Sequence, residues 1–333
     1  MIIKVLFSMF LFWSVLLADK TDSYHLGEGV QVASFPMYIG GYISTDYRNF
    51  NGENRYRLDD LALLSYGNYN KFSYMAELEY KGFYVLTENA GTYTTGQDRT
   101  LHTERLYVNY AFDENYNFRV GKYSTPAGFW NLLPINVLRD TTSIPQSTNL
   151  LFPKFTTGVL LSYKSYDDAN FNVDVMLQNN ADLDATYNNY NMDEHYGIGF
   201  GYEKNNLALK FNFGLFDGLF ANNSSQNLYY YMASFKYETE KIELLGELGS
   251  QKIAHSYTTK YAGFLQGLYR FTQKHAGVLR LESYDNKKTA TLEDIAIFAY
   301  SYRPLYPISI KAEYQFHSIH KNNQALVSFS VLF

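Results

Sequence analysis

The chain has 333 residues, a formal net charge of -5 and no cysteine. The lack of cysteine excludes disulfide frameworks, thiolate metal sites and cysteine nucleophiles, and the mild acidity gives no nucleic-acid-binding footprint. Tyrosine (33) and phenylalanine (25) are abundant, yet the mean hydropathy is slightly polar. This combination favours an all-β transmembrane barrel, in which aromatic rings gather at the membrane interfaces and half of each strand faces water. A soluble all-β protein of this length would need two domains, and no linker divides the chain.

The amino-terminal segment has the order of a secretory signal peptide. Lys4 precedes an apolar run over residues 5–17, which ends at Ala18 before a polar stretch. The run is shorter than the about 20 apolar residues that a spanning helix needs. The segment that follows is too short to plug a wide barrel, which argues against an energy-coupled transporter. We expect a signal peptide over 1–18, a short periplasmic segment over 19–35 and a transmembrane β-barrel over 36–333.

Sixteen strands are predicted from period-2 alternation and β-propensity. They cover residues 37–47, 58–66, 72–85, 101–112, 116–123, 156–164, 171–178, 196–203, 207–216, 229–237, 242–250, 261–271, 275–284, 295–302, 308–317 and 324–333. An even number of strands suits an antiparallel barrel that closes on itself without leaving an edge. The predicted fold is therefore a 16-stranded antiparallel transmembrane β-barrel in the outer membrane of a Gram-negative bacterium.

The connections between the predicted strands alternate in length. Those after even-numbered strands are brief, and those after odd-numbered strands are longer and rich in Asn, Asp, Ser, Thr and Gly. Examples of the longer links are 180–194, 217–227 and 251–260. Outer-membrane barrels have short turns on the periplasmic rim and long loops outside, so both ends of the barrel are expected on the side of the short turns.

Even-numbered strands finish with aromatic residues on their apolar face. Rings at one depth around a barrel form an interfacial girdle, whereas cross-strand aromatic pairing in a soluble sheet would explain one hairpin only. The predicted girdle and terminal strand include Tyr110, Tyr202, Tyr237, Tyr269, Tyr302 and Phe333. The last strand, 324–333, also resembles the terminal aromatic signature of bacterial outer-membrane proteins. That resemblance implies outer-membrane lipid and the barrel assembly machinery as partners.

The connection after the fifth strand, residues 124–155, is far longer than its neighbours. It contains four prolines and an apolar run that includes Phe129, Trp130 and Leu133. Loops of this length are commonly functional, and apolar residues exposed on a free loop would form an adhesive patch. We expect this third long loop to fold into the lumen. Its position and size resemble the constriction loop of sixteen-stranded general diffusion porins.

A motif at the start of this loop also indicates a family. Residues 119–128 read Arg-Val-Gly-Lys-Tyr-Ser-Thr-Pro-Ala-Gly, which is similar to the R-x-G-x-x-x-x-P-x-G segment that leads into the constriction loop of phosphate-selective porins. The preceding strand, 105–110, resembles the tyrosine-rich strand of the same family. The resemblance implies a bacterial outer-membrane porin, with a homotrimer as one possible assembly.

The alternation assigns charged side chains to the lumen. The predicted constriction and lumen residues are Arg105, Arg119, Arg139, Asp140, Lys154, Arg270, Arg280, Lys311, Glu282 and Glu313. Opposed acidic and basic walls would orient polar solutes, rings of one sign would select ions, and a solvated lining would do neither. The acidic and basic residues are nearly balanced, and the loop has no basic run. The sequence therefore leaves solute identity and the preference for anions or cations open.

The sequence contains no sign of catalysis, a metal site or a cofactor. The seven histidines scatter over predicted loops and strand ends, where solvated side chains are expected, and no phosphate-binding, zinc-protease or serine-hydrolase motif occurs. Two functions remain. The first is a porin for passive diffusion of small hydrophilic solutes and ions, narrowed by loop 124–155. The alternative is a surface scaffold, adhesin or receptor with a closed lumen, which would have no need for a long inward loop.

Overall fold

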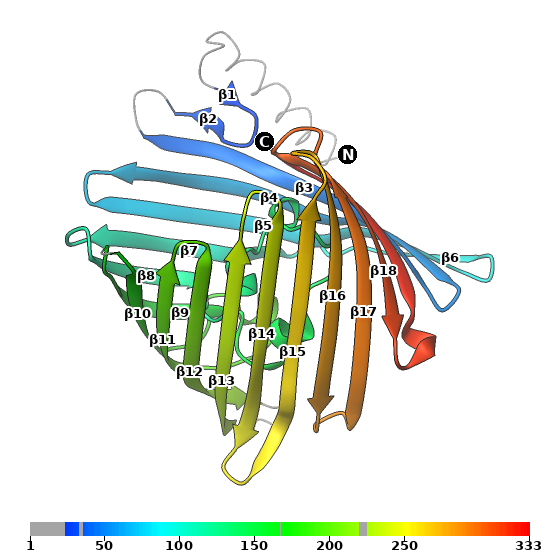
Figure 1. The fold of residues 1–333 in the computed structure, drawn as a ribbon. Helices are drawn as coiled ribbons and strands as arrows, with labels where there is room; N and C mark the ends of the chain where they lie inside the picture. The colour runs from blue at the N-terminus through cyan, green and yellow to red at the C-terminus, as the bar shows by residue number, and fades with distance from the viewer. Residues whose placement is uncertain (1–23, 33–35, 167, 220–224) are drawn as a thin grey trace.

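The computed structural model describes residues 24–32, 36–166, 168–219 and 225–333 (Figure 1). The predicted signal peptide lies outside the described residues, and only 24–32 of the predicted periplasmic segment are described. These residues form β1 (Tyr24–His25) and β2 (Gly29–Gln31), a small hairpin that pairs with the first barrel strand. No helix among the described residues is both long and apolar enough to cross a membrane.

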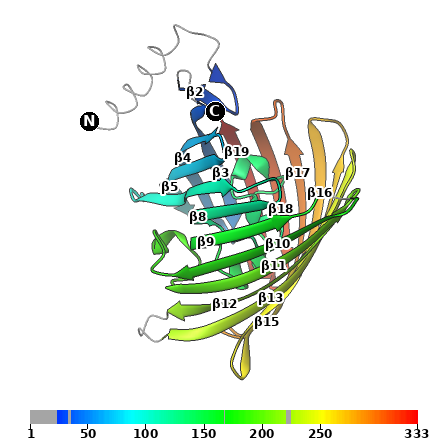
Figure 2. The same cartoon turned by 90° about the vertical axis from the view of Figure 1, so that its left-hand side faces the viewer.

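Sixteen antiparallel strands form a closed barrel, as predicted. The barrel strands are β3 (Met37–Phe50), β4 (Glu53–Tyr69), β5 (Phe72–Asn89), β7 (Leu101–Ala111), β8 (Tyr116–Ser124), β9 (Phe155–Lys164), β10 (Asn170–Asn179), β11 (Glu194–Lys204), β12 (Leu207–Leu219), β13 (Ser225–Glu238), β14 (Ile242–Ile253), β15 (Ser256–Arg270), β16 (His275–Asn286), β17 (Thr291–Tyr302), β18 (Ile308–His317) and β19 (Gln324–Leu332). A further strand, β6 (Thr92–Gly96), extends the outer end of β5 as a hairpin. Figure 2 shows the wall from the side of β8 to β13.

Closure takes place between β19 and β3, with Leu332 opposite Tyr42. The main chain of Phe333 completes the seam, because its N–H donates to the carbonyl of Gly41 and its carbonyl accepts from the Gly41 N–H, each at 2.8 Å. Met37, at the start of β3, lies opposite Gly67, beside the two-residue turn between β4 and β5. Both ends of the barrel therefore lie on the rim of short turns.

Most residues of the long links predicted on the opposite rim belong to strands in the structure. β3 and β4 remain paired as far as Phe50 and Glu53, and β14 and β15 as far as Ile253 and Ser256. The apolar alternation fades there, but the backbone groups still gain hydrogen bonds from the ladder, so the strands continue. The long connections that remain on this rim are 90–100, which contains β6, and the loops 125–154 and 180–193.

The two faces of the wall differ as the alternation predicts. In β19, Val327 and Phe329 are exposed on the outer face, whereas Leu326, Ser328 and Ser330 are buried. The predicted girdle residues lie close to the short-turn rim, and cross-strand ring pairs occur among them. Examples are Phe72 with Tyr110 at 4.9 Å, Phe171 with Tyr202 at 5.2 Å and His275 with Tyr302 at 4.7 Å between ring centroids.

Depth in the membrane should decide the cost of a charge on the outer face. Leu265 and Tyr269 lie on the same face of β15 and are similarly exposed, but Leu265 lies nearer mid-strand. We expect Leu265→Arg to lower the free energy of unfolding by about 2–4 kcal/mol and Tyr269→Arg by only about 0–1 kcal/mol. Denaturant titration of barrels folded in vesicles measures both values. Equal losses at the two sites would contradict the assigned depth.

Candidate pore constriction

The loop after β8, residues 125–154, lies against the inner face of the barrel. It contains η1 (Trp130–Leu132), η2 (Asn136–Leu138) and α2 (Gln146–Leu150), and the strands enclose these short helical segments in both views (Figures 1 and 2). The loop contacts β12, β14, β16, β18 and β19 through polar side chains of the wall. It therefore extends from β8 across the lumen to the opposite wall.

Two glycines of the 119–128 motif let the chain enter the lumen. Gly121 has a φ of +128°, and a Cβ at this position would lie 2.1 Å from the carbonyl oxygen of Leu106. Gly128 has a φ of +67°, and a Cβ there would meet the Glu247 carboxylate at 2.5 Å. A side chain at either site would be strained and would collide, so both residues must be glycine for the strand to reach the loop in this geometry.

Glu247 on β14 holds the first turn of the loop. Its Oε1 accepts hydrogen bonds from the backbone N–H groups of Phe129 at 2.7 Å and Trp130 at 2.9 Å. The Trp130 ring packs edge-on against Phe264, with centroids 6.0 Å apart, and lies 5.1 Å from the guanidinium carbon of Arg280. Trp130 is thus covered by the wall, as the sequence led us to expect. Burial of the whole apolar run is not observed, because Leu132 and Leu133 remain exposed.

Two pairs of predicted lumen charges hold the middle of the loop. Arg280 donates to Oγ1 of Thr141 at 2.9 Å, and its neighbour Glu282 accepts from the N–H of Gln146 at 2.9 Å. Lys311 donates to the carbonyl of Asn136 at 2.7 Å, and Glu313 accepts from the N–H of Thr142 at 2.9 Å and from the Ser143 hydroxyl. Arg280 and Lys311 are completely buried. These four charges point inward, but the loop covers them.

The other predicted lumen charges lie at different levels of the barrel. Arg270 is at the short-turn rim, where it pairs with Glu238 at 3.1 Å. Arg105 forms an ion pair with Glu77 on the neighbouring strand. Asp140 of the loop pairs with Arg303 at 3.2 Å.

Arg119 has a local role. Its guanidinium lies over the Tyr107 ring at 4.1 Å and donates to Asn109 at 2.7 Å. Arg119, Arg139 and Asp140 were all predicted for the constriction and lumen, but Arg119 makes no contact with the other two in the described part of the chain.

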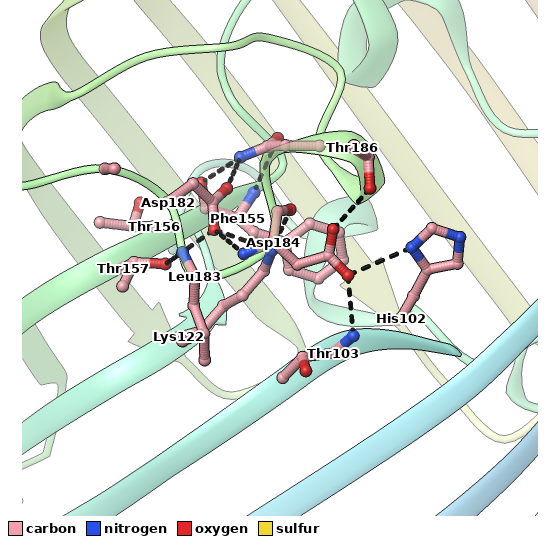
Figure 3. A network of polar contacts seen from close by, with 12 residues as sticks. His102, Thr103, Lys122, Phe155, Thr156, Thr157, Asp182, Leu183, Asp184 and Thr186 are labelled. Atoms are coloured by element: carbon pink, nitrogen blue, oxygen red, sulfur yellow. Dashed lines mark hydrogen bonds and ion pairs between the residues drawn. The ribbon is translucent and has the colours of Figure 1, made fainter. Parts of the chain in front are cut away.

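A second loop, residues 180–193 after β10, also folds inward, and the sequence did not predict this. Lys122 on β8 forms an ion pair with Asp182 at 2.8 Å, and both side chains are completely buried (Figure 3). The ammonium group also donates to the carbonyl of Asp184 at 2.7 Å, and Asp182 accepts from the Thr157 hydroxyl at 2.8 Å. The loop is thereby attached to β8 and β9.

Asp184 attaches the same loop to β7. Its carboxylate lies 3.1 Å from Nδ1 of His102, accepts from the N–H of Thr103 at 2.9 Å and accepts from the Thr186 hydroxyl at 2.6 Å (Figure 3). His102 is buried. The expectation that the histidines are solvated is therefore wrong for His102, and also for His195 and His317.

The two loops bind each other. The Asn189 side chain accepts from the N–H of Lys154 at 2.8 Å and donates to the carbonyl of Phe152 at 2.9 Å, and the hydroxyl of Tyr190 donates to the carbonyl of Leu150 at 2.6 Å. The sequence feature that could have predicted the inward fold of loop 180–193 is its apolar residues, since Met192 is completely buried. The predicted constriction loop is therefore half of a two-loop unit.

A cavity of about 490 Å³ remains between the loops and the wall of β5 and β7. Arg139 and Lys154 line it from the loop, and Glu104 and Lys81 line it from the wall. The acids of this wall are engaged, because Glu104 accepts from the Tyr187 hydroxyl at 2.9 Å and Lys81 forms ion pairs with Asp60 and Glu79 at 2.6 and 3.5 Å. Arg139 and Lys154 have no carboxylate partner among the described residues.

Burial, together with the positive charges of Lys81 and Arg139, lowers the pKa of Lys154 to about 8, although Glu104 opposes the shift. A lysine is charged below its pKa, so raising the pH from about 7 to about 9 should remove this charge and reduce any preference for anions. The other charged or titratable groups that line the cavity are Lys81, Asp98, His102, Glu104, Arg139 and Tyr187. Reversal potentials measured over this range should shift toward cations in the wild type and shift much less in Lys154→Met. An equal shift in both proteins would assign the titration to another group.

Comparisons with known proteins identify the family. Residues 43–325 match the model of the beta-barrel porin-2 family, OmpL-like. The fold is similar to that of the outer-membrane channel DcaP of Acinetobacter baumannii, with a TM-score of 0.60, 11% identity, and 92% of this chain and 100% of that chain covered. For OmpF of Salmonella typhi the TM-score is 0.64 at 11% identity, with 89% and 97% covered. For an anion-selective porin from Comamonas acidovorans it is 0.60 at 11% identity, with 89% and 99% covered.

Comparison with curated proteins finds no match. The family model covers well over half of the chain, and the structural neighbours have a similar fold over about nine-tenths of the chain. The chain therefore belongs to the OmpL-like β-barrel porin-2 family and forms a channel for passive diffusion in the outer membrane of a Gram-negative bacterium.

Proposed function

We propose that loops 125–154 and 180–193 together form the constriction of this channel, and that small hydrophilic solutes and ions diffuse past Arg139 and Lys154. The observation that carries this proposal is the cavity between the loops and the β5–β7 wall, which contains two cations without a carboxylate partner among the described residues. Uncompensated positive charge at a narrow point favours anions. The role is diffusion rather than catalysis, in keeping with a family of channel proteins.

The alternative function, a scaffold or receptor with a closed lumen, gains no support from the loops. Such a protein would act through segments outside the barrel, whereas the two long loops are attached to the inner wall by buried polar contacts such as Glu247 with Phe129 and Lys122 with Asp182. A lumen that conducts no ions would nevertheless favour this alternative over the channel.

Ion preference tests the proposed constriction. In planar bilayers under a salt gradient, the wild type should have a reversal potential that indicates a preference for anions. Arg139→Glu should move the potential toward cation preference, because the substitution reverses a charge on the cavity. Lys252→Glu makes the same charge change at an exposed site near the outer end of β14 and should have little effect. Reversal potentials that are unchanged in Arg139→Glu would contradict the proposal.

The remaining partners and boundaries belong to the same proposal. The apolar outer face is suited to lipid, and insertion by the barrel assembly machinery and assembly into a homotrimer rest on the resemblance to porins. The division into a signal peptide over 1–18, a periplasmic segment over 19–35 and a barrel stays part of this proposal, and the start of β3 at Met37 supports only its last boundary. Mass measurement of the mature protein and crosslinking in intact membranes would check the cleavage site and the trimer.

A further inference from the structure

The cavity at the constriction is lined by residues whose hydrogen-bond donors are unsatisfied. Nε of Arg139, Nε1 of Trp130 and Oγ1 of Thr148 are buried, and none has a hydrogen-bond partner among the residues that the structure describes. All three residues line the cavity of about 490 Å³. A buried donor without an acceptor is costly. These three atoms have almost no accessible surface and lie behind the cavity wall, so the site is assigned from the charges and the apolar side chains that face the cavity.

These side chains form a preorganised site and not a solvated rim. Arg139 is 7%, Trp130 3% and Thr148 2% exposed. The far end of Arg139 is fixed because its Nη2 donates to the carbonyl of Pro134 at 2.8 Å, and the indole of Trp130 is fixed against Phe264. Side chains that are held in place before binding lose little conformational entropy when the ligand arrives.

The charge of the site favours an anion. Lys154 also lines the cavity, and its ammonium group has no hydrogen bond or ion pair with any described residue. On the opposite side, Glu104 is occupied by the Tyr187 hydroxyl at 2.9 Å. Asp98 accepts a hydrogen bond from a backbone N–H and lies 3.8 Å from His102. Arg139 and Lys154 are thus the charges available to a ligand.

Apolar side chains share the lining with polar ones such as Asn131 and Thr186, and the apolar part selects the kind of anion. Leu133, Ile144 and Phe155 line the same cavity, and a fully hydrated inorganic anion would leave their surfaces without a partner. We propose that the cavity is a binding site for a small organic carboxylate, whose carboxylate contacts Arg139 and Lys154 while its apolar body lies against Leu133, Ile144 and Phe155. This inference rests on the proposed function, since the site lies at the proposed constriction.

The chain contains its own probe of this site. It has two tryptophans, Trp13 within the predicted signal peptide and Trp130 in the cavity. The fluorescence of the mature protein in detergent therefore reports on Trp130. Titration with benzoate should give a saturable change. Benzyl alcohol, which lacks the charge, and inorganic phosphate, which lacks the apolar body, should bind at least about ten-fold more weakly.

Matched variants identify the contacts. Arg139→Met should weaken benzoate binding by about ten-fold, because it removes a charge-assisted hydrogen bond. Lys154→Met, which removes the second cation without a carboxylate partner among the described residues, should also weaken it by about ten-fold. Lys252→Met removes a positive charge near the outer end of β14, away from the cavity lining, and should leave binding unchanged. If Arg139→Met does not fold, Lys154→Met decides.

The possible results separate this inference from the channel itself. No saturable change with benzoate, equal binding of phosphate, or wild-type affinity in Arg139→Met and Lys154→Met would overturn the organic-carboxylate site. Potassium chloride conductance is measured on the same preparations. Normal conductance without benzoate binding refutes only this site, whereas benzoate binding without conductance refutes the channel and leaves the site.

Discussion

Replacing residues 132–145 with a short Gly/Ser linker should raise the single-channel conductance by about two-fold or more, because the segment crosses the lumen and conduction depends on the narrowest cross-section. The segment carries the contacts of Arg280, Lys311 and Glu313 with the loop. Removal therefore opens the lumen and also exposes wall charges that the loop now covers. Conductance in planar bilayers at high salt measures the result.

The matched control removes residues 88–93, at the tip of the β5–β6 hairpin. This hairpin projects from the barrel in Figure 1, so its removal should leave the conductance at the wild-type value. Heat-modifiable migration on gels shows whether each deletion variant is folded. A folded variant that lacks 132–145 and conducts like the wild type would exclude loop 125–154 from the constriction.

The second large effect is expected from Lys122→Met, which leaves Asp182 charged and buried. Removal of one partner of a buried ion pair typically costs about 3–5 kcal/mol. The barrel ladders do not depend on this pair, so the loss should appear as release of loop 180–193 from the wall. We expect rapid proteolysis within this loop and a noisier open-channel current than in the wild type.

A double substitution serves as the control for the ion pair. Lys122→Met combined with Asp182→Leu replaces the pair with apolar side chains, which is often close to neutral. The Thr157 hydroxyl then loses its bond with Asp182, so rescue should be partial but clear. Proteolysis of Lys122→Met at the wild-type rate would show that the ion pair does not hold the loop in the lumen.

The barrel was predictable from the sequence because one physical rule applies to every spanning strand. A lipid face and a water face alternate with period 2, and this alternation located all sixteen strands and the closing strand that ends at Phe333. The alternation ends at the edge of the membrane, because neither face of a strand contacts lipid beyond it. Two predicted strands therefore end too early, at residues 47 and 250, whereas the observed strands continue to Phe50 and Ile253. Strand pairs above the membrane have polar side chains on both faces, so they show no apolar alternation.

The candidate site was only partly predictable, for a different reason. Apolar residues in loop 125–154 indicated that it must be covered, and Trp130 is covered as expected. Loop 180–193 is mostly polar, and its burial depends on contacts of Asp182 with Lys122 and of Asp184 with His102, which lie far apart in the chain. Alternation also showed that Arg280 points inward, but it could not show that the loop would cover it.

Thiol labelling at Lys154 tests whether the water path through this barrel runs past the two loops. The chain has no cysteine, so Lys154→Cys provides a single reactive site at the proposed constriction. A charged, water-soluble methanethiosulfonate reagent added to an open channel should produce a stepwise fall in conductance, while the same reagent on Val327→Cys, which faces outward in β19, should produce none. If the conductance of a labelled Lys154→Cys channel stays at its unlabelled value, water and ions do not pass Lys154, and the two loops do not form the constriction.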